Sequence, residues 1–326
     1  MTKLSILELG RVKEGSDRRT ALNEARDLAV HAEKLGYERF WVAEHHNMAA
    51  VTTAATSLVI QHIAAATSTI RVGAGGVMLP NHAPYVIAEQ FGTLETLFPG
   101  RIELGLGRAP GTDPMTLRAL RRNPASADHF PQDVLELQHY LGPLEPGQKI
   151  EAVPGSNTNV PLWILGSSLF GAQLAAELGL PYGFASHFAP QALDDALRVY
   201  RELFKPSAQL SEPYVLIGAN IIAADTDEEA RWLATSQQMS FANLVRGQRN
   251  LMLPPIDNID DYWSPMERAQ ASQMLECSVV GSPSTVKAGI EQLLERTQAD
   301  EIMVVSDMFY AEKRRQSLKL IHSAMP

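Results

Sequence analysis

Phe40-Trp41-Val42-Ala43 is an apolar run that ends abruptly in Glu44-His45-His46-Asn47. A short apolar run is typical of a buried β-strand, so a carboxylate, two imidazoles and an amide are expected at the carboxyl end of that strand. Histidine is the side chain best suited to moving protons near neutral pH. The stretch therefore predicts a strand that places reactive groups where it stops.

Short apolar strands alternate with longer amphipathic helices along almost the whole chain. The first helix shows apolar residues at spacings of three and four from Leu22 to Leu35, and Gly36 stands where a helix carboxyl end favours glycine. The predicted strands are 3–9, 39–43, 70–79, 101–107, 161–165, 182–185, 214–224 and 301–305. The predicted helices are 22–35, 54–66, 84–97, 132–141, 169–178, 190–204, 227–245 and a final helix after the last strand.

Eight strands, each followed by a helix, predict the α/β class and a (β/α)8 TIM barrel that spans residues 1–326 as a single domain. Two segments interrupt the alternation. Residues 110–128 are rich in Pro, Asp and Arg, and residues 247–273 contain Pro254-Pro255 and Trp263. An irregular stretch of this length is usually functional or disordered, so an insertion or lid is expected between the seventh helix and the eighth strand.

Composition limits the possible partners. The chain has 326 residues and a formal net charge of −9, which argues against nucleic acid and against an anionic membrane surface. Its one cysteine, Cys277, rules out an intramolecular disulfide and a cysteine-built zinc site. The amino-terminal apolar run is too short for a signal peptide, and no apolar run reaches about 18 residues. We expect a cytoplasmic protein.

In a TIM barrel the carboxyl ends of the strands carry the active site, so polar residues at those ends are the candidates. They are Glu44, His45, His46, Asn47, Gly75, Gly76, Asn81, His82, Arg108, Ser167, Ser168, Ser186, His187 and Asp307.

Gly166-Ser167-Ser168 stands between a predicted strand and a predicted helix. Free N–H groups at a helix amino terminus bind anions, and serine hydroxyls add donors. A serine that only caps the helix is the plainer alternative. Arg108, at the end of the neighbouring strand, is able to supply a charge-assisted hydrogen bond to the same anion. Together these residues predict a phosphate site.

Gly73-Ala74-Gly75-Gly76 lies within the third strand, where glycine usually marks a bulge or a nearby ligand. It provides either steric accommodation inside the barrel or a platform for a flat ring. Adjacent His45 and His46 point to opposite sides of an extended chain, so we expect no metal, His82 and His187 being the only candidate partners. Neither a serine elbow nor a helper beside Cys277 supports nucleophilic catalysis.

The chain resembles the flavin-dependent luciferase-like monooxygenases, the family of the bacterial luciferase subunits, over nearly its whole length. The matching motifs are Trp41-Val-Ala-Glu44-His45-His46, Val77-Met-Leu-Pro80 with His82 and Pro84, Gly100-Arg101-Ile-Glu-Leu-Gly-Leu-Gly107-Arg108, and Leu165-Gly-Ser-Ser168 followed by Ala175-Ala-Glu-Leu-Gly-Leu-Pro181.

The resemblance implies FMN at the strand ends, its phosphate held by Arg108 and by backbone groups at Ser167 and Ser168. It implies a cis peptide under the flavin ring at Gly75-Gly76, a catalytic histidine at His45 and a neighbouring glutamate at Glu44. Gly107 stands where luciferase has a reactive cysteine, so light emission is not expected.

The family also implies a separate reductase that supplies reduced FMN, a homodimer, and O2 with a small organic molecule as substrates. No further lysine or arginine is expected at the rim, which makes a sulfonate substrate less favoured. The alternatives are an F420-dependent oxidoreductase, ranked lower because a polyanionic cofactor would require more cations, and a non-catalytic flavin-binding protein, which the presence of Glu44, His45 and Arg108 disfavours.

Overall fold

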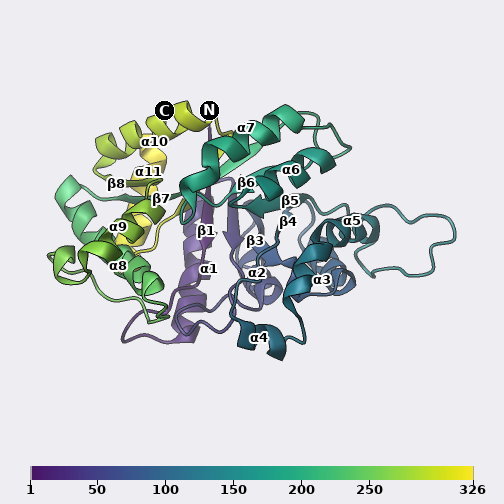
Figure 1. The fold of residues 1–326 in the computed structure, drawn as a ribbon, viewed down its shortest axis with the longest axis horizontal. Helices are drawn as coiled ribbons and strands as arrows, with labels where there is room; N and C mark the ends of the chain where they lie inside the picture. Colours follow the sequence, from purple (N-terminus) through teal and green to yellow (C-terminus); the bar gives the residue numbers. More distant parts are fainter. Residues whose placement is uncertain (1, 326) are drawn as a thin grey trace.

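A computed structural model describes residues 2–325, in which eight parallel strands close into a barrel with helices on its outside (Figure 1). Neighbouring strands are hydrogen-bonded in the order of the chain, and the last barrel strand pairs with both the first and the seventh. The barrel strands are β1 (Lys3–Glu8), β2 (Arg39–Val42), β3 (Arg71–Met78), β4 (Ile102–Gly107), β5 (Leu162–Gly166), β6 (Tyr182–Phe184), β7 (Val215–Ala223) and β9 (Glu301–Val305). The predicted (β/α)8 barrel is confirmed.

The main helices pack around the strands. They are α1 (Arg18–Leu35), α2 (Thr56–Ala64), α3 (Pro84–Leu97), α5 (Phe130–Leu141), α6 (Leu169–Leu178), α7 (Leu193–Leu203), α8 (Asp227–Val245) and α11 (Ala311–Ala324). In α1 the buried face consists of Ala21, Ala25, Leu28, Ala29 and Ala32. Asp17 caps its amino end by accepting from the Thr20 N–H, and Gly36 ends it at φ 87°, a conformation that glycine adopts without steric cost.

Two of the three apolar clusters in the described residues hold the barrel strands together. The larger one lies between the strands and the helices, and a smaller cluster fills the barrel interior. The interior cluster consists of Leu7, Trp41, Ala43, Trp163, Leu216, Met303 and Val305. Trp41 and Trp163 meet edge to face with ring centroids 5.0 Å apart, an arrangement that favours aromatic packing. The barrel is therefore a filled core, and ligand chemistry is confined to its ends.

The insertion before the last barrel strand is more regular than the sequence predicted. After the short turn η4 (Ile259–Asp261) come α9 (Pro265–Met274), β8 (Ser278–Gly281) and α10 (Pro283–Thr297), none of which was predicted. A Ser264–Glu267 capping box begins α9, a local signal that was overlooked. β8 is only four residues long and pairs with the carboxyl half of β7, on the edge opposite β9.

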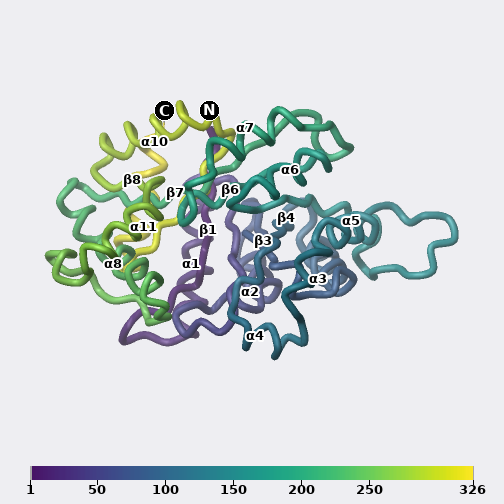
Figure 2. Tube along the Cα trace, in the orientation of Figure 1, coloured from purple at the N-terminus to yellow at the C-terminus, as the bar shows by residue number. Residues whose placement is uncertain are grey.

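The predicted irregular segment 110–128 likewise contains structure, namely α4 (Pro114–Ala119) and the turn η2 (Pro124–His129). Two further turns, η1 (Leu79–Asn81) and η3 (Pro190–Ala192), lead into α3 and α7. Figure 2 traces the chain from purple to yellow and shows the first strand and the last helix on the same side of the view. In the described residues, no helix is long and apolar enough to cross a membrane.

The segment that follows α8 also contacts the loop that follows β1. The Met252 N–H donates to the Val12 carbonyl at 3.0 Å, and the Glu14 N–H donates to the Met252 carbonyl at 2.8 Å. Arg249 donates to the carbonyl of Asn47 at 3.0 Å. The segment therefore lies against the loops that follow β1 and β2, at the carboxyl end of the barrel.

Candidate active site at the carboxyl ends of the strands

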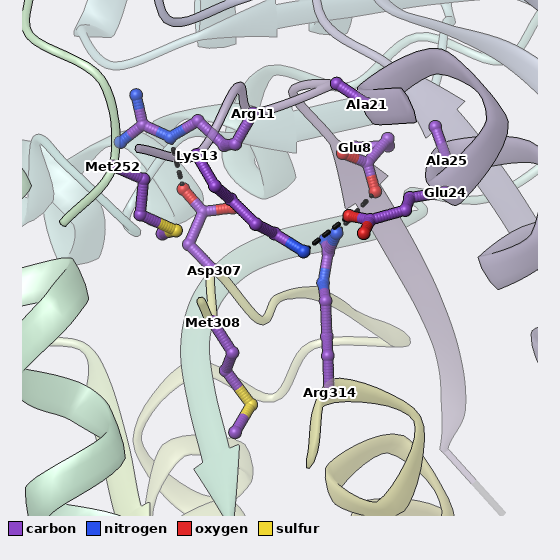
Figure 3. A pocket seen from close by; sticks show the side chains of 10 residues that line it. All are labelled: Glu8, Arg11, Lys13, Ala21, Glu24, Ala25, Met252, Asp307, Met308 and Arg314. Carbon is purple, nitrogen blue, oxygen red and sulfur yellow. Dashed lines mark hydrogen bonds and ion pairs between the residues drawn. The ribbon is translucent and has the colours of Figure 1, made fainter. Parts of the chain in front are cut away.

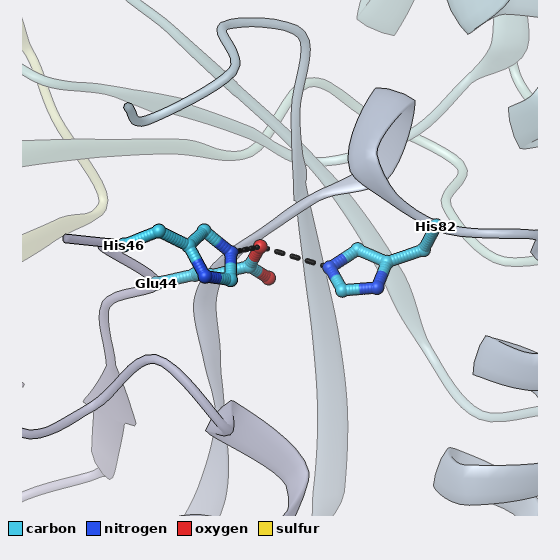
Figure 4. A group of neighbouring side chains, drawn as sticks. All are labelled: Glu44, His46 and His82. Carbon is cyan, nitrogen blue, oxygen red and sulfur yellow. Dashed lines mark hydrogen bonds and ion pairs between the residues drawn. The ribbon is translucent and has the colours of Figure 1, made fainter. Parts of the chain in front are cut away.

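Glu44, just beyond β2, is buried and accepts hydrogen bonds on both carboxylate oxygens. Its Oε1 lies 2.7 Å from Nε2 of His46 and 2.8 Å from Nε2 of His82, and Oε2 accepts from the Met78 N–H at 3.2 Å (Figure 4). Burial acts to raise the pKa of Glu44, but the hydrogen bonds from the two histidines outweigh it and hold the pKa below its usual range. Glu44 is therefore an ionised carboxylate that orients two imidazoles.

Glu44, His46 and His82 also bring one ligand atom each to within 4.8 Å of one another, a spacing compatible with a metal ion. This set differs from the partners considered from the sequence, because Glu44 takes part and His187 does not. Each of the three atoms already has a hydrogen-bond partner within the set. The absence of a metal stays a prediction.

His45 diverges from His46, as expected for adjacent residues on an extended chain. Its Nδ1 is buried and has no hydrogen-bond partner among residues 2–325. Burial, and next the nearby charge of Arg11, lower the pKa of His45 to about 4. The imidazole is neutral at physiological pH, and its buried nitrogen is available to a hydrogen-bonding group of a ligand.

His187, beyond β6, has the same character. Its Nδ1 is likewise buried and unpartnered within the described chain, and its ring lies against Gly218 so closely that any side chain at position 218 would collide with it. Burial lowers the pKa of His187 to about 4, opposed by Asp307 and reinforced by His45. The charges of Asp307 and His45, from the ends of β9 and β2, thus act on His187 at the end of β6.

The predicted phosphate residues come together at the amino end of α6. The Arg108 guanidinium lies 4.1 Å from the ring centroid of Phe170, in the first turn of that helix. Ser168 is the N-cap residue, yet its hydroxyl makes no capping hydrogen bond. The plainer capping alternative is therefore not realised. An exposed guanidinium, two hydroxyl groups and a helix amino terminus together fit an anionic phosphate.

The Gly75–Gly76 peptide bond is cis, as the family resemblance implied. A Cβ on Gly75 would lie 2.7 Å from Cδ1 of Leu7, and one on Gly76 would lie 2.6 Å from the Gly105 carbonyl oxygen. Gly76 is needed for close packing against the backbone of β4, and a side chain at Gly75 would require Leu7 in the barrel interior to move, which supports steric accommodation. A role as a platform for a flat ring stays a prediction.

Two cations at the rim were missed from the sequence. Arg11 follows β1, and its Nε donates to Oδ2 of Asp307 at 3.0 Å. Arg249, from the insertion, donates to Oδ2 of Asp113 at 3.1 Å. The expectation of no further lysine or arginine at the rim is therefore wrong. Arg11 stands only three residues after the end of β1, so the rule used for the other strand ends would have found it.

A (β/α)8 barrel with titratable side chains gathered at the carboxyl ends of its strands defines the class of TIM-barrel enzymes. Residues 2–301 match the luciferase-like monooxygenase family, and the chain belongs to that family. It is 51% identical to a luciferase-like monooxygenase of Escherichia coli (strain K12), over 97% of this chain and 95% of that protein. It is 35% identical to the N-acetyl-S-alkylcysteine monooxygenase of Bacillus subtilis (strain 168), over 100% and 98% respectively.

Among solved structures, apo-MsnO8 is similar over 99% of this chain and 98% of that one, with 34% identity and a TM-score of 0.88. Two more distant structures share the fold. One is the oxygenating constituent of 3,6-diketocamphane monooxygenase from Pseudomonas putida in complex with FMN, at 18% identity, coverage of 98% and 96%, and TM-score 0.74. The other is an F420-dependent secondary alcohol dehydrogenase, at 15% identity, coverage of 100% and 99%, and TM-score 0.72. A flavin-type cofactor is compatible with the fold.

Proposed function

We propose that this protein is an FMN-dependent monooxygenase that uses reduced flavin and O2 to oxidise a small organic molecule without emitting light. The observation that carries the proposal is the position of the Arg108 guanidinium 4.1 Å from the Phe170 ring at the start of α6, where the Ser168 hydroxyl makes no capping hydrogen bond, in a chain of the luciferase-like family. Reduced FMN, when bound, would supply the electrons that activate O2. The relative named for N-acetyl-S-alkylcysteine supports an organic substrate that is small.

The roles of the protein's own residues follow from their surroundings. His45, held neutral, is available to take a proton from a reacting group or to hold one transiently. Glu44 acts through the histidines that it orients, because both of its oxygens are engaged in hydrogen bonds. Arg108 and the backbone at Gly166, Ser167 and Ser168 fix the phosphate end.

Gly107 supports the expectation of no light emission and no thiol-dependent step. A Cβ there would lie 2.9 Å from Sδ of Met78, so a cysteine at this position would require the methionine to move. The proposal further includes a cytoplasmic location, a separate flavin reductase, a single domain over 1–326 and a homodimer. Light scattering that finds only a 35.7 kDa species would rule out the homodimer.

The test is a titration of the purified protein with FMN, reduced FMN and F420, followed by absorbance and fluorescence, for the parent and Arg108→Ala. We expect reduced FMN to bind and Arg108→Ala to weaken it about 10- to 100-fold, the range for a hydrogen bond to a charged group. Binding of F420 alone would establish the oxidoreductase alternative. FMN binding with no oxidation of any tested substrate would favour the non-catalytic alternative.

A further inference from the structure

Arg11 is held rigidly at the mouth of the barrel. The Val12 N–H donates to the Ala50 carbonyl at 2.9 Å, and Arg11 itself forms a bridge with Val51, so the backbone is fixed on the loop that follows β2. The side chain is only 17% exposed, and its Nε is anchored on Asp307, which is 4% exposed. Its guanidinium therefore has one defined orientation.

This anchoring uses one of the five guanidinium N–H groups. Within residues 2–325, neither terminal nitrogen of Arg11 has a hydrogen-bond partner. Figure 3 shows Nε directed at Asp307 and the two terminal nitrogens turned away from it. A guanidinium fixed through Nε presents its terminal nitrogens as a planar fork, which matches the two oxygens of a carboxylate.

The charge of Arg11 acts on the proposed catalytic imidazole. After burial, Arg11 is the largest influence that lowers the pKa of His45, and the charge of Arg249 acts in the same direction. Arg249 approaches from the insertion and is tied to Asn47 and Asp113. An anionic group on Arg11 would thus lie within electrostatic reach of His45, at the end of β1 rather than at the end of β4, where Arg108 stands.

We propose that Arg11 binds the carboxylate of a small organic acid, which makes the substrate of this enzyme a carboxylic acid oxidised elsewhere in its chain. The assignment of this acid as substrate rests on the proposed function, whereas the carboxylate site itself does not. Asp307 is the positioning residue that holds the fork in place.

The test uses hexanoate, its neutral isostere hexanamide, and hexanesulfonate, titrated by calorimetry into the flavin-free protein. We expect hexanoate to bind at least about 10-fold more tightly than hexanamide, because a charge-assisted hydrogen-bond pair is lost with the amide. Arg11→Gln should weaken hexanoate about 10- to 100-fold and leave hexanamide unchanged. Arg11→Lys, which keeps the charge without the fork, should give an intermediate affinity.

The control is Arg198→Gln, an exposed arginine on α7, which should bind all three probes as the parent does. Because Arg11→Gln leaves Asp307 without its cation, the double variant Arg11→Gln/Asp307→Asn tests the site without an unpaired buried charge, and it should also have lost the preference for hexanoate. Equal binding of hexanoate and hexanamide by the parent overturns the proposal. So does a preference for hexanesulfonate, or unchanged hexanoate binding by Arg11→Gln.

FMN titration separates this proposal from the proposed function. FMN binding should be the same in Arg11→Gln as in the parent. If Arg11→Gln weakens FMN as much as Arg108→Ala does, Arg11 serves the flavin and the carboxylate assignment falls. If the parent binds no FMN but binds hexanoate through Arg11, the monooxygenase proposal fails and the carboxylate site stands.

Discussion

Arg39 at the start of β2 and His45 just beyond its end are both largely enclosed, but only Arg39 is paired. Its Nη1 donates to Oε2 of Glu301 at 2.7 Å, and its Nε forms an ion pair with Oε2 of Glu103 at 3.1 Å, without hydrogen-bond geometry. Tyr214 and Trp41 donate to the same two carboxylates at 2.8 and 3.0 Å. At the other end of the barrel, Nδ1 of His45 and of His187 and Oδ1 of Asp307 have no partner in the described residues.

This difference in pairing distinguishes polar groups that stabilise the fold from polar groups that are available to a ligand. Buried polar groups in folded proteins are normally hydrogen-bonded, so a group left unpartnered calls for a specific reason. At the amino ends of the strands, opposite charges and aromatic donors meet one another, and these contacts serve the fold. At the carboxyl ends, His45, His187 and Asp307 each keep a buried atom without a partner in the described residues, and these are the groups that a ligand is expected to complete.

The largest effect on stability is expected from removing Arg39 from the ion pairs at the amino ends of the strands. Arg39→Met leaves Glu301 buried without its cation and leaves Glu103 paired only with Arg71, and loss of one partner from a buried ion pair costs about 3–5 kcal/mol. Denaturant unfolding should show a loss of that size in the free energy of unfolding. The exposed Arg198→Met, on α7, should change it by less than about 0.5 kcal/mol. A loss below 1 kcal/mol in Arg39→Met would mean that the cluster is not structural.

At the carboxyl ends of the strands, we expect a substitution to lower activity without lowering stability. His45→Asn should lower reduced-FMN-dependent substrate oxidation about 100-fold or more, the lower range for loss of a general acid or base, while the free energy of unfolding stays nearly constant. His62→Asn, a histidine on α2 away from the mouth, is the control. Full activity in His45→Asn would remove the proton-transfer role.

A third expectation concerns pH. The pKa values of His45 and His187 are about 4 in the folded protein, against an ordinary value of 6.5. As the pH falls from about 6.5 to about 4, these two histidines become protonated in the unfolded chain but stay neutral in the folded protein. The free energy of unfolding therefore decreases. The double variant His45→Asn/His187→Asn should lose less stability than the parent over this interval in urea unfolding at pH 7.5, 6 and 5. Parallel curves would contradict the assignment.

The smallest effect is expected at Ser168. Its hydroxyl makes no capping hydrogen bond, so Ser168→Ala should change the free energy of unfolding by less than about 0.5 kcal/mol. Thr226, which caps α8 by accepting from the Glu229 N–H at 3.1 Å, is the matched comparison, and Thr226→Ala should cost about 1 kcal/mol. If Ser168→Ala lowered the free energy of unfolding more than Thr226→Ala, the role of Ser168 would be structural.

Local patterns in the sequence were sufficient for most of the barrel. The helices at Pro84–Leu97, Leu169–Leu178 and Asp227–Val245 agree with the prediction at both ends, because periodic apolar residues and end signals lie within each segment. β8 was missed because it is four residues long, with only alternate residues fully buried. Its pairing with β7 is a tertiary contact that no local pattern contains.

The sequence predicted which strand ends carry the site residues, but not which side chains form hydrogen bonds or ion pairs with one another. The gathering of His45, His187 and Asp307 follows from the closure of the barrel, which the strand count implied. That Glu44 is shared by His46 and His82 depends on the path of the turn η1 after β3, which the sequence does not specify. The Arg11–Asp307 pair joins residues 296 positions apart and was equally inaccessible.

Two imidazoles share one oxygen of Glu44, and this arrangement determines which ring nitrogen of each histidine carries a hydrogen. An ionised carboxylate only accepts, so His46 and His82 must each carry hydrogen on Nε2. In the neutral ring, Nδ1 is then a bare lone pair turned away from Glu44. In that neutral form the two histidines offer acceptors, whereas Arg11 offers only donors. A molecule with a hydroxyl or amide hydrogen at one end and an anionic group at the other would therefore have one preferred direction in the mouth of the barrel.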